Sequence, residues 1–410
     1  LDEKTFESEE TELANDLLSI TTSSVVNNWE KDVIKNLKVR IYPTPTQRKI
    51  FKEWFGTTRY VYNRVLDAFE NKGEKNNAYE LRNKYVTSKN NSNVNEWEKR
   101  TPMNVRANTV LKLSSNYKSA FSNLKNGNIV RFKMRFKSKK DRSQALFLPK
   151  SSIEMKNGSM TIGKHSISKF WSSERKGDKY AFSKFKLKGK TKKRDINIDS
   201  QCTLTYDGLY YHVLIPKKTR PKKVQKRCEN TIVALDPGLR KFQTGFSQSE
   251  IFTVERTAML KKYNKRISYL HGKFQRNNTR KILKTYRRSA NIVSDIHWKL
   301  ITYLTDNYEH VLIPKFESQE LQKITMSKHS NRLYDTYKHY LFKQRLIEKS
   351  KEKINTRVYM VNEAYTSVTC TNCGTINAKT RSEMSTCKTC KLLSDRDIRG
   401  SRNIFIKYVQ

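Results

Sequence analysis

Two Cys-x-x-Cys pairs near the C-terminal end of the chain constrain its local fold more than any other feature. Cys370 and Cys373 form the first pair, Cys387 and Cys390 form the second, and thirteen residues separate them. Two such pairs at this distance can form a tetrahedral tetrathiolate zinc site on two tight turns. Four reduced thiols without a metal would be unusual in so polar a segment. Four thiolates leave no position for water, so we expect a structural zinc ion.

Three acidic residues follow apolar or cysteine-rich segments in the same half of the chain. Asp236 ends the run TIVALD, Glu317 ends the run HVLIPKFE, and Asp397 follows the cysteine pairs. Strand ends can direct such side chains at one point, where they repel one another unless cations lie between them. Mg²⁺ prefers oxygen ligands, and two Mg²⁺ ions about 4 Å apart support in-line phosphodiester cleavage. One Asp after a strand commonly caps a turn, so the prediction depends on all three acids.

The order of elements around these acids predicts the fold of the C-terminal half. Two long basic helices follow the third strand, one around Ile267 and one around Ile296, and a further helix is predicted over 332–351. The order strand, strand, strand, helix, strand, helix, strand is typical of an RNase H-like sheet, whose second and third strands are antiparallel. The predicted strands are 231–236, 242–247, 251–255, 310–317 and 356–362.

The N-terminal half mixes helices with short strands. Residues 36–43 alternate like a strand, a helix begins at Thr46, and a second helix covers 102–126 with an apolar face that includes Phe121 and Leu124. Residues 128–215 consist of short alternating pieces, and Asp207-Gly208 predicts a hairpin within 203–215. We expect a small β-barrel into which the helices of 46–127 are inserted. The basic, proline-containing stretch 216–227 is expected to be a linker.

Basic and aromatic residues alternate in RFKMRFKSKK (131–140). Such a pattern fits a strand or groove that holds a nucleic-acid backbone and stacks on its bases. A half-buried strand with core Phe and solvated Lys gives the same pattern. The candidate contacts in the N-terminal half are Arg59, Tyr60, Asn63, Arg131, Phe132, Lys133, Arg135, Phe136 and Lys137.

The charge of the chain favours a polyanionic partner. The 410 residues include 83 basic and 39 acidic side chains, a net charge of +44, which attracts phosphate backbones. A structural RNA-binding protein would explain that charge equally well. Residues 1–35 are expected to be an acidic tail. No run approaches the ~20 apolar residues that span a bilayer, and the first residues do not resemble a signal peptide. We therefore expect an intracellular protein without membrane contacts.

Several motifs together resemble one family. The resemblance is to the TnpB proteins of insertion-sequence transposons and, more closely, to their eukaryotic and giant-virus relatives, the Fanzor proteins. The motifs are ALDPG (234–238), PKFE (314–317), EAYTS-x-TC-x-NCG (363–374), DRD-x-x-x-x-RNI (395–404), IYPTPTQ (41–47), WFGTTRYVYN (54–63) and the segment 119–140. They extend over most of residues 35–410.

The resemblance implies an RNA-guided DNA endonuclease. A guide (omega) RNA from the transposon end would direct the protein to double-stranded DNA beside a short target-adjacent motif, where one RuvC site cuts both strands. Asp236, Glu317 and Asp397 would be the three RuvC acids, with Asp395 structural. The family usually has Asn and small residues after DRD-x, whereas this chain has Arg399-Gly400-Ser401, which puts the support of the third acid in question.

The family also implies a domain plan and partners. The protein would be an α+β multidomain monomer within a ribonucleoprotein, with two catalytic Mg²⁺ ions and one structural Zn²⁺ ion. It would be nuclear in a eukaryotic or viral setting, or cytoplasmic and nucleoid-associated in a bacterium. The expected parts are an acidic tail (1–35), an OB-like wedge β-barrel (36–45 and 128–227), a helical recognition domain (46–127), a RuvC nuclease domain (228–369 and 391–410) and a zinc-finger insertion (370–390).

Two other functions remain open from the sequence. A nuclease-inactive regulator that binds guide RNA and DNA would share the charge and the motifs. A strand-transfer transposase could use an RNase H-like sheet, although no end-binding helix-turn-helix is recognisable. His297, in Asp-x-His-x-Lys, is a further candidate for substrate contact, but a histidine on a helix face is more often a packing residue.

Overall fold

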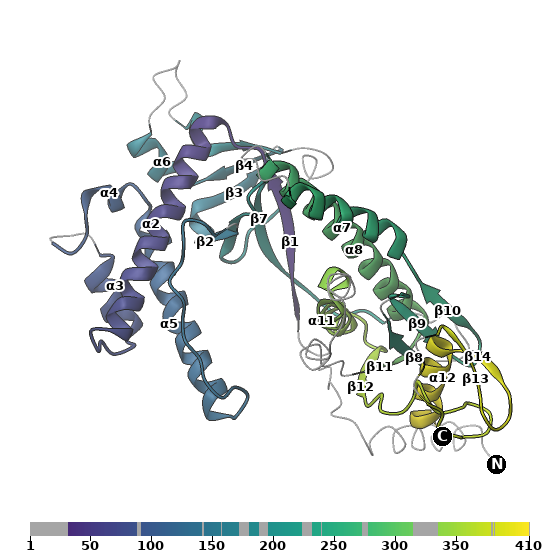
Figure 1. Ribbon diagram of the computed structural model, residues 1–410. Coiled ribbons are helices and arrows are strands. Elements are labelled where there is room, and N and C mark those ends of the chain that lie inside the picture. Colours follow the sequence, from purple (N-terminus) through teal and green to yellow (C-terminus); the bar gives the residue numbers. More distant parts are fainter. Residues whose placement is uncertain are drawn as a thin grey trace, which may run out of the picture. The chain divides into compact units, whose positions relative to one another are not determined.

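The structure is a computed structural model in which two compact units are distinguished, an N-terminal unit (34–218) and a C-terminal unit (219–410, with 1–33). Figure 1 shows their helices and strands. The structure describes residues 32–87, 92–141, 143–156, 158–171, 180–187, 196–223, 232–238, 240–272, 278–314, 335–378, 380 and 382–409. Most of the expected acidic tail and Glu317 lie outside these described residues. None of the described helices is both long and apolar enough to cross a membrane.

Two sheets form the β-structure of the N-terminal unit. The first has the order β1-β7-β6-β2, built from β1 (Val33–Ile41), β2 (Gln144–Leu148), β6 (Cys202–Tyr206) and β7 (Tyr211–Thr219). The second has the order β3-β4-β5, built from β3 (Ile153–Lys156), β4 (Ser159–Ile162) and β5 (Lys184–Lys186). A bridge between Tyr42 and Lys186 connects the end of β1 with β5. The strand near residue 40 and the predicted hairpin therefore belong to one sheet.

Helix α2 (Pro45–Glu70) begins where the sequence predicts a helix. Thr44 and Gln47 form a reciprocal capping box, with Gln47 N 3.3 Å from Thr44 Oγ1 and Thr44 N 2.8 Å from Gln47 Oε1. The first half of α2 packs on the sheets through apolar residues such as Phe51 and Trp54. Its second half forms a separate core with the helices that follow. These are α3 (Ala78–Tyr85) and α5 (Met103–Lys125), while the short α4 (Glu96–Lys99) lies between them in the chain and α6 (Lys164–Phe170) follows β4.

One local expectation for this unit was wrong, while the predicted hairpin at Asp207-Gly208 and the predicted helix over 102–126 are both present. β7 continues to Thr219, so the first residues of the expected linker are strand. The hairpin turn spans Asp207 to Tyr210, because Asp207 Oδ1 accepts hydrogen bonds from the backbone N–H groups of Leu209 and Tyr210. The apolar face of α5 is not buried along its whole length, since Phe121 is 51% and Leu124 36% exposed.

The C-terminal unit contains a five-stranded mixed sheet in the order β10-β9-β8-β11-β12. The pairs β10–β9 and β9–β8 are antiparallel, and the pairs β8–β11 and β11–β12 are parallel. This agrees with the predicted order of elements and with the antiparallel second and third strands. The strands are β8 (Ile232–Pro237), β9 (Gln243–Phe246), β10 (Ile251–Val254), β11 (His310–Pro314) and β12 (Arg357–Val361).

Helices cover both faces of this sheet, which explains why its central strands are continuous apolar runs. One face packs on α7 (Thr257–Gly272), α8 (Asn278–Asn307) and α11 (His339–Ser350). The other face packs on α12 (Arg396–Val409), through residues that include Ala234 and Val361. A short hairpin, β13 (Met384–Thr386) and β14 (Leu393–Asp395), leads into α12. The expected α+β multidomain architecture is thus confirmed.

Candidate functional site

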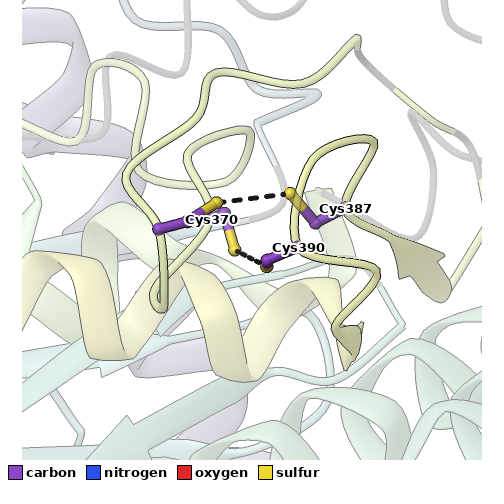
Figure 2. Close-up of side chains that lie close together, drawn as sticks. Cys370, Cys387 and Cys390 are labelled. Atoms are coloured by element: carbon purple, nitrogen blue, oxygen red, sulfur yellow. Dashed lines mark hydrogen bonds between the residues drawn. The ribbon is translucent and has the colours of Figure 1, made fainter.

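The four predicted zinc ligands converge in one cluster. The Sγ atoms of Cys370, Cys373, Cys387 and Cys390 all lie within 4.8 Å of one another. Two contacts in Figure 2 join the turns, at 3.5 Å between Cys370 and Cys390 and 3.6 Å between Cys373 and Cys387. These separations are far longer than the ~2.05 Å S–S bond of a disulfide. The cysteines are therefore reduced thiols that face a common centre.

This geometry fits a tetrahedral metal centre. A Zn–S bond of about 2.3 Å places tetrahedral sulfur atoms about 3.8 Å apart, close to the two contacts of the cluster. A backbone N–H from Cys390 is the main cause that lowers the pKa of Cys387 to about 6, which favours the metal-binding thiolate. The four cysteines can hold one zinc ion and leave no open coordination position for a substrate. A structural role is the one that this ligand set supports.

Helix α12 anchors the cysteine turns to the sheet. Asn403 on α12 donates hydrogen bonds of 2.8 Å to the carbonyl oxygens of Thr366 and Thr369, just before the first cysteine. Arg399 donates from Nη2 to Ser385 Oγ at 2.6 Å, in strand β13, which directly precedes the second pair. The two bonds from Asn403 give this residue of the Arg-Asn-Ile sequence (402–404) a physical role. The cysteine cluster and α12 thus form one connected structure.

Asp236 and Asp397 are brought together where β8 meets α12. Asp236 ends the central strand β8, and Asp397 lies in the first turn of α12, which packs on β8. An ideal Cβ placed on Gly400 of α12 would lie 2.3 Å from Asp236 Oδ2, and one placed on Gly238 would lie 3.9 Å from Asp397 Oδ2. Each acid therefore faces the glycine of the other element. The two carboxylates share one small space at the carboxyl end of the central strand.

The electrostatics of this space favour a bound cation. Burial first, and then the negative charges of Asp397 and Glu363, raise the pKa of Asp236 well above its usual value, while Arg396 opposes the rise. Like charges in a partly buried space cost free energy that a cation between them removes. Carboxylate oxygens are the ligands that Mg²⁺ prefers. The carboxylates of Asp236, Asp397 and Glu363 therefore form a donor set that suits Mg²⁺, while Glu317 lies outside the described residues.

Glu363 is an acid of this edge that the sequence analysis did not select. It follows β12, which is parallel to β11, as β11 is to β8. Pro314 pairs with Val361 in this register, and Leu312 pairs with Ala234, so the carboxyl ends of the three strands are level. Burial raises the pKa of Glu363 as well. Its place directly after the predicted strand 356–362 was the available indication, since Asp236 and Glu317 were selected at the ends of predicted strands.

Asp395 has a structural role, as expected. Its Oδ1 accepts hydrogen bonds from the backbone N–H groups of Asp397 (2.8 Å) and Ile398 (3.2 Å), which caps the N-terminus of α12. Its Oδ2 lies 2.5 Å from Lys241 Nζ, and Lys241 also pairs with Glu383 at 3.4 Å. The lysine therefore connects the loop after β8 with the hairpin of the cysteine cluster. Both connections help to fix the direction of Asp397.

The unusual Arg399-Gly400-Ser401 stretch supports the acid pair. Gly400 leaves room for Asp236, because any larger side chain there would meet its carboxylate. Arg399 is 3% exposed and bound to Ser385, and Ser401 is fully buried with its hydroxyl donating to the carbonyl of Ile398 at 3.0 Å. The Arg399-Gly400-Ser401 stretch, which departs from the family pattern, therefore packs without displacing Asp236. Arg399 takes its own hydrogen-bonding role.

A Gly400→Ala substitution is expected to displace Asp236 and slow any reaction that needs it by about 10–100-fold, because catalysis is sensitive to shifts near 1 Å. Alanine is otherwise favoured over glycine within a helix, so the melting temperature should not fall greatly. The measurement is the rate of metal-dependent cleavage. Gly272→Ala is the matched control, since a Cβ there meets nothing within 4 Å. Equal rates for both variants would show that Asp236 is not used.

His297 is a packing residue. It is fully buried, with Nε2 2.9 Å from the carbonyl oxygen of Tyr337 and Nδ1 3.1 Å from Arg345 Nη1. Burial is the main cause that lowers its pKa to about 4, so the ring is neutral near pH 7. The neutral ring donates through Nε2 and accepts through Nδ1. Its neighbours Asp295 and Lys299 form a surface ion pair at 2.9 Å.

The two segments predicted to contact nucleic acid meet in the N-terminal unit, where Asn63 of α2 contacts Lys137. Residues 131–137 are not a strand; they form an extended segment without regular secondary structure. Two hydrogen bonds join Asn63 to the backbone of Lys137. Asn63 Nδ2 donates to the Lys137 carbonyl oxygen at 2.9 Å, and the Lys137 N–H donates to Asn63 Oδ1 at 2.7 Å. Phe132 packs edge-on against Tyr117 and Phe121 of α5. The basic residues between, Arg131, Lys133 and Arg135, are exposed.

Comparisons with known proteins give related families for both units. Residues 339–404 match the family described as Cas12f1-like, TNB domain, and residues 33–77 match a helix-turn-helix domain family of IS605 OrfB proteins. The first match covers α11 to α12, with the four cysteines and Asp397. The second was not expected from the sequence. In this chain it covers strand β1 and the single unbroken helix α2.

Similar whole chains come from giant viruses. The A625R protein of Paramecium bursaria Chlorella virus 1, named as a transposase, is 27% identical over 94% of this chain and 90% of that protein. The TnpB-like protein L770 of Acanthamoeba polyphaga mimivirus is 26% identical over 90% of this chain and 72% of that protein. A solved Cas12f1-sgRNA-target DNA complex aligns with 91% of this chain and 98% of that chain, at 16% identity and a TM-score of 0.34, too low to establish a shared fold.

Proposed function

The chain belongs to the TnpB/Fanzor family of transposon-associated proteins, and on that premise we propose that it is an RNA-guided DNA endonuclease. The observation that carries the proposal is the pairing of Asp236 with Asp397 at the carboxyl end of β8. The C-terminal unit would be a RuvC nuclease domain with residues 370–390 as its zinc-finger insertion. The net charge of +44 supplies the affinity for RNA and DNA backbones.

Asp236, Asp397 and Glu317 are the proposed catalytic acids. Two Mg²⁺ ions held there would stabilise the attacking water and the leaving 3′-oxygen of a phosphodiester. The chain's own residues fix the geometry: Gly400 admits the Asp236 carboxylate, and Asp395 caps the helix that carries Asp397. Arg396, with Nη2 3.5 Å from Asp397 Oδ1, partly offsets the charge of the acids. Lys241 keeps the loop after β8 against the N-terminus of α12.

The proposed partners of the protein are a guide RNA and double-stranded DNA. The guide is an omega RNA from the transposon end, and the target is double-stranded DNA beside a short target-adjacent motif. The N-terminal unit would contain the wedge and recognition domains that contact them, as a monomer with one guide. The basic stretch 216–227 would serve nuclear import in a eukaryotic host. A reporter fused to the chain with its lysines in 216–227 replaced should then leave the nucleus.

The proposed function is tested with the protein purified together with RNA expressed from its own locus. Sequencing that RNA identifies the guide, and a plasmid library with matched target and randomised flanks is then incubated with Mg²⁺. We expect cleavage only of matched plasmids with a defined flanking motif. A scrambled guide is the control. Tight binding without cleavage at any Mg²⁺ concentration would instead establish a nuclease-inactive regulator.

One observation favours a different reaction, since the viral A625R protein is named as a transposase. Strand transfer would use the same acids but would join transposon ends to a target. The same preparation, supplied with labelled ends of the element, separates the two reactions. Cleavage of matched plasmid without joined products supports the endonuclease. Joined products that need no guide RNA would replace it.

A further inference from the structure

We propose that a cavity of the N-terminal unit binds an unpaired nucleotide, with its base on a tyrosine pair and its phosphates against helix α2. The cavity has a volume of about 680 Å³, within the range of about 300–1,000 Å³ that is usual for ligand sites. All of its lining residues belong to this unit. The nucleic-acid partner is taken from the proposed function, but the site requires no nuclease activity.

The floor of the cavity is one cross-strand row of the four-stranded sheet. Gln144 of β2 pairs with Tyr206 of β6, and Tyr206 pairs with Tyr211 of β7. Residues directly opposite on paired strands project from the same face. The two tyrosine rings are stacked, with centroids 4.5 Å apart and planes at 28°. Both tyrosines line the cavity, and Tyr211 also contacts Phe51 of α2, with ring centroids 5.6 Å apart, so the outer face of Tyr206 is the part of the pair that is left for a base.

One face of α2 forms the wall above this floor. Arg48, Lys52, Phe55 and Arg59 line the cavity and recur at spacings of four, three and four residues, which places them on one side of a helix. Arg48 Nε donates to the carbonyl oxygen of Pro43 at 3.1 Å, which orients its guanidinium. Lys49 lies beside them on the same helix. The wall therefore presents a row of cations along about three turns.

The charge of the cavity is strongly positive. Five basic side chains line it, and Glu53 is the one carboxylate among its lining residues; Glu53 also lies 3.9 Å from Arg100. A smaller space of about 200 Å³ continues from it and shares Phe55, Arg59 and Gln144. That continuation reaches Lys137, at the end of the extended basic segment 131–137. Cations thus follow one path from α2 to this segment.

This combination fits an unpaired nucleic-acid strand better than other anions. Aromatic side chains stack on bases whose faces are free, and cations beside them hold the backbone, which is the usual design of single-strand binding sites. Bases within a duplex are stacked on one another and offer no free face. An acidic peptide would pair with the cations but would gain little from the tyrosine floor. The ligand class is therefore a single-stranded segment, of RNA or of DNA.

The test uses the full-length Asp236→Asn chain, freed of copurified RNA, so that cleavage does not interfere. The probes are six-residue uridine and deoxyuridine oligonucleotides with one 5-iodouracil, which crosslinks to aromatic side chains under ultraviolet light. We expect a crosslink to Tyr206 or Tyr211, located by mass spectrometry. The preference between the two probes identifies RNA or DNA as the source of the nucleotide. Crosslinks confined to other tyrosines would overturn the proposal.

Two sets of variants separate stacking from phosphate contacts. Tyr206→Leu should weaken binding about 5- to 150-fold, whereas Tyr206→Phe, which keeps the ring, should restore it. Lys49→Gln with Lys52→Gln should reduce the salt dependence of log K by about 1.4, which is the change for two lost contacts to a single strand. Lys112→Gln with Lys118→Gln, on exposed positions of α5, is the matched control. Equal losses in both lysine pairs would show only general attraction.

Competition completes the test. A hexaglutamate peptide and a duplex of the same sequence should both compete poorly with the single-stranded probe. Equal competition by the peptide would show a general anion site and would overturn the proposal, as would stronger binding of the duplex. The nuclease is judged separately with the wild-type chain. A crosslink at Tyr206 without any plasmid cleavage would support the cavity proposal and contradict the nuclease. Cleavage without that crosslink would support the nuclease and contradict the cavity proposal.

Discussion

Replacement of Asp236 by Asn is expected to abolish cleavage of matched DNA and to leave guide RNA bound. Asp236 shares its space with Asp397 at the end of β8, and Asn removes one negative charge and one strong cation ligand. We expect a fall in rate on the order of 10³-fold or more, equivalent to about 4 kcal/mol of transition-state stabilisation. The measurement is single-turnover cleavage with Mg²⁺, together with the amount of copurified RNA.

The same substitution is expected to raise the stability of the metal-free protein. The pKa of Asp236 is raised in the folded state, so the native protein holds its proton more tightly than the unfolded chain. The folded state is then penalised as pH rises above the unfolded pKa, and the penalty is complete above the folded pKa. Asn removes it, so the melting temperature without metal should rise at pH 7. Added Mg²⁺ should stabilise the wild type more than the variant.

Asp295→Asn is the matched control for both measurements. Asp295 is an exposed acid on α8 that pairs with Lys299, far along the sequence from the proposed site. Cleavage and melting temperature should stay near their wild-type values in this variant. If Asp236→Asn cuts matched plasmid as fast as the wild type, the catalytic assignment fails. A lower melting temperature with lost cleavage would point instead to a structural role for Asp236.

The fold of the C-terminal unit was predictable because its signals are local. Central strands such as β8 are covered on both faces, so they read as short apolar runs that end in polar residues. The cluster of four cysteines was equally predictable from the sequence, since the geometry of a tight turn sets the spacing within each pair. Asp395 could be separated from Asp397 only through the family motif, and the helix cap explains that separation.

What could not be predicted depends on contacts between distant segments. Gly400 and Asp236 are in contact although 164 positions separate them in the sequence, and no local sequence pattern near either residue indicates that contact. The tyrosine floor requires the register of β2, β6 and β7, which a one-residue shift would destroy. The segment 131–137 has the alternation of a strand but docks on helices through Asn63. Periodicity alone does not distinguish a strand from an extended segment packed on a helix.

Removal of the cysteine cluster is expected to inactivate the protein by releasing Asp397. Strand β14 starts three residues after Cys390 and ends at Asp395, the cap of α12. Metal binding to four thiolates supplies a large share of the folding free energy of such small segments, about 10–16 kcal/mol in zinc-finger peptides. Cys370→Ser with Cys373→Ser should therefore lose one zinc per chain and most of the cleavage activity.

The mechanism of that loss can be separated from general unfolding. Amide hydrogen exchange should rise in residues 382–396, because Arg399–Ser385 and Lys241–Asp395 would lose their fixed partners. Exchange in the N-terminal unit should stay unchanged, since its core is built from its own residues. Lys388→Arg, on the second turn, keeps all four thiols and the charge and should retain zinc and cleavage. Full cleavage by the zinc-free variant would show that α12 alone positions Asp397, since its cap and its packing on β8 would then suffice.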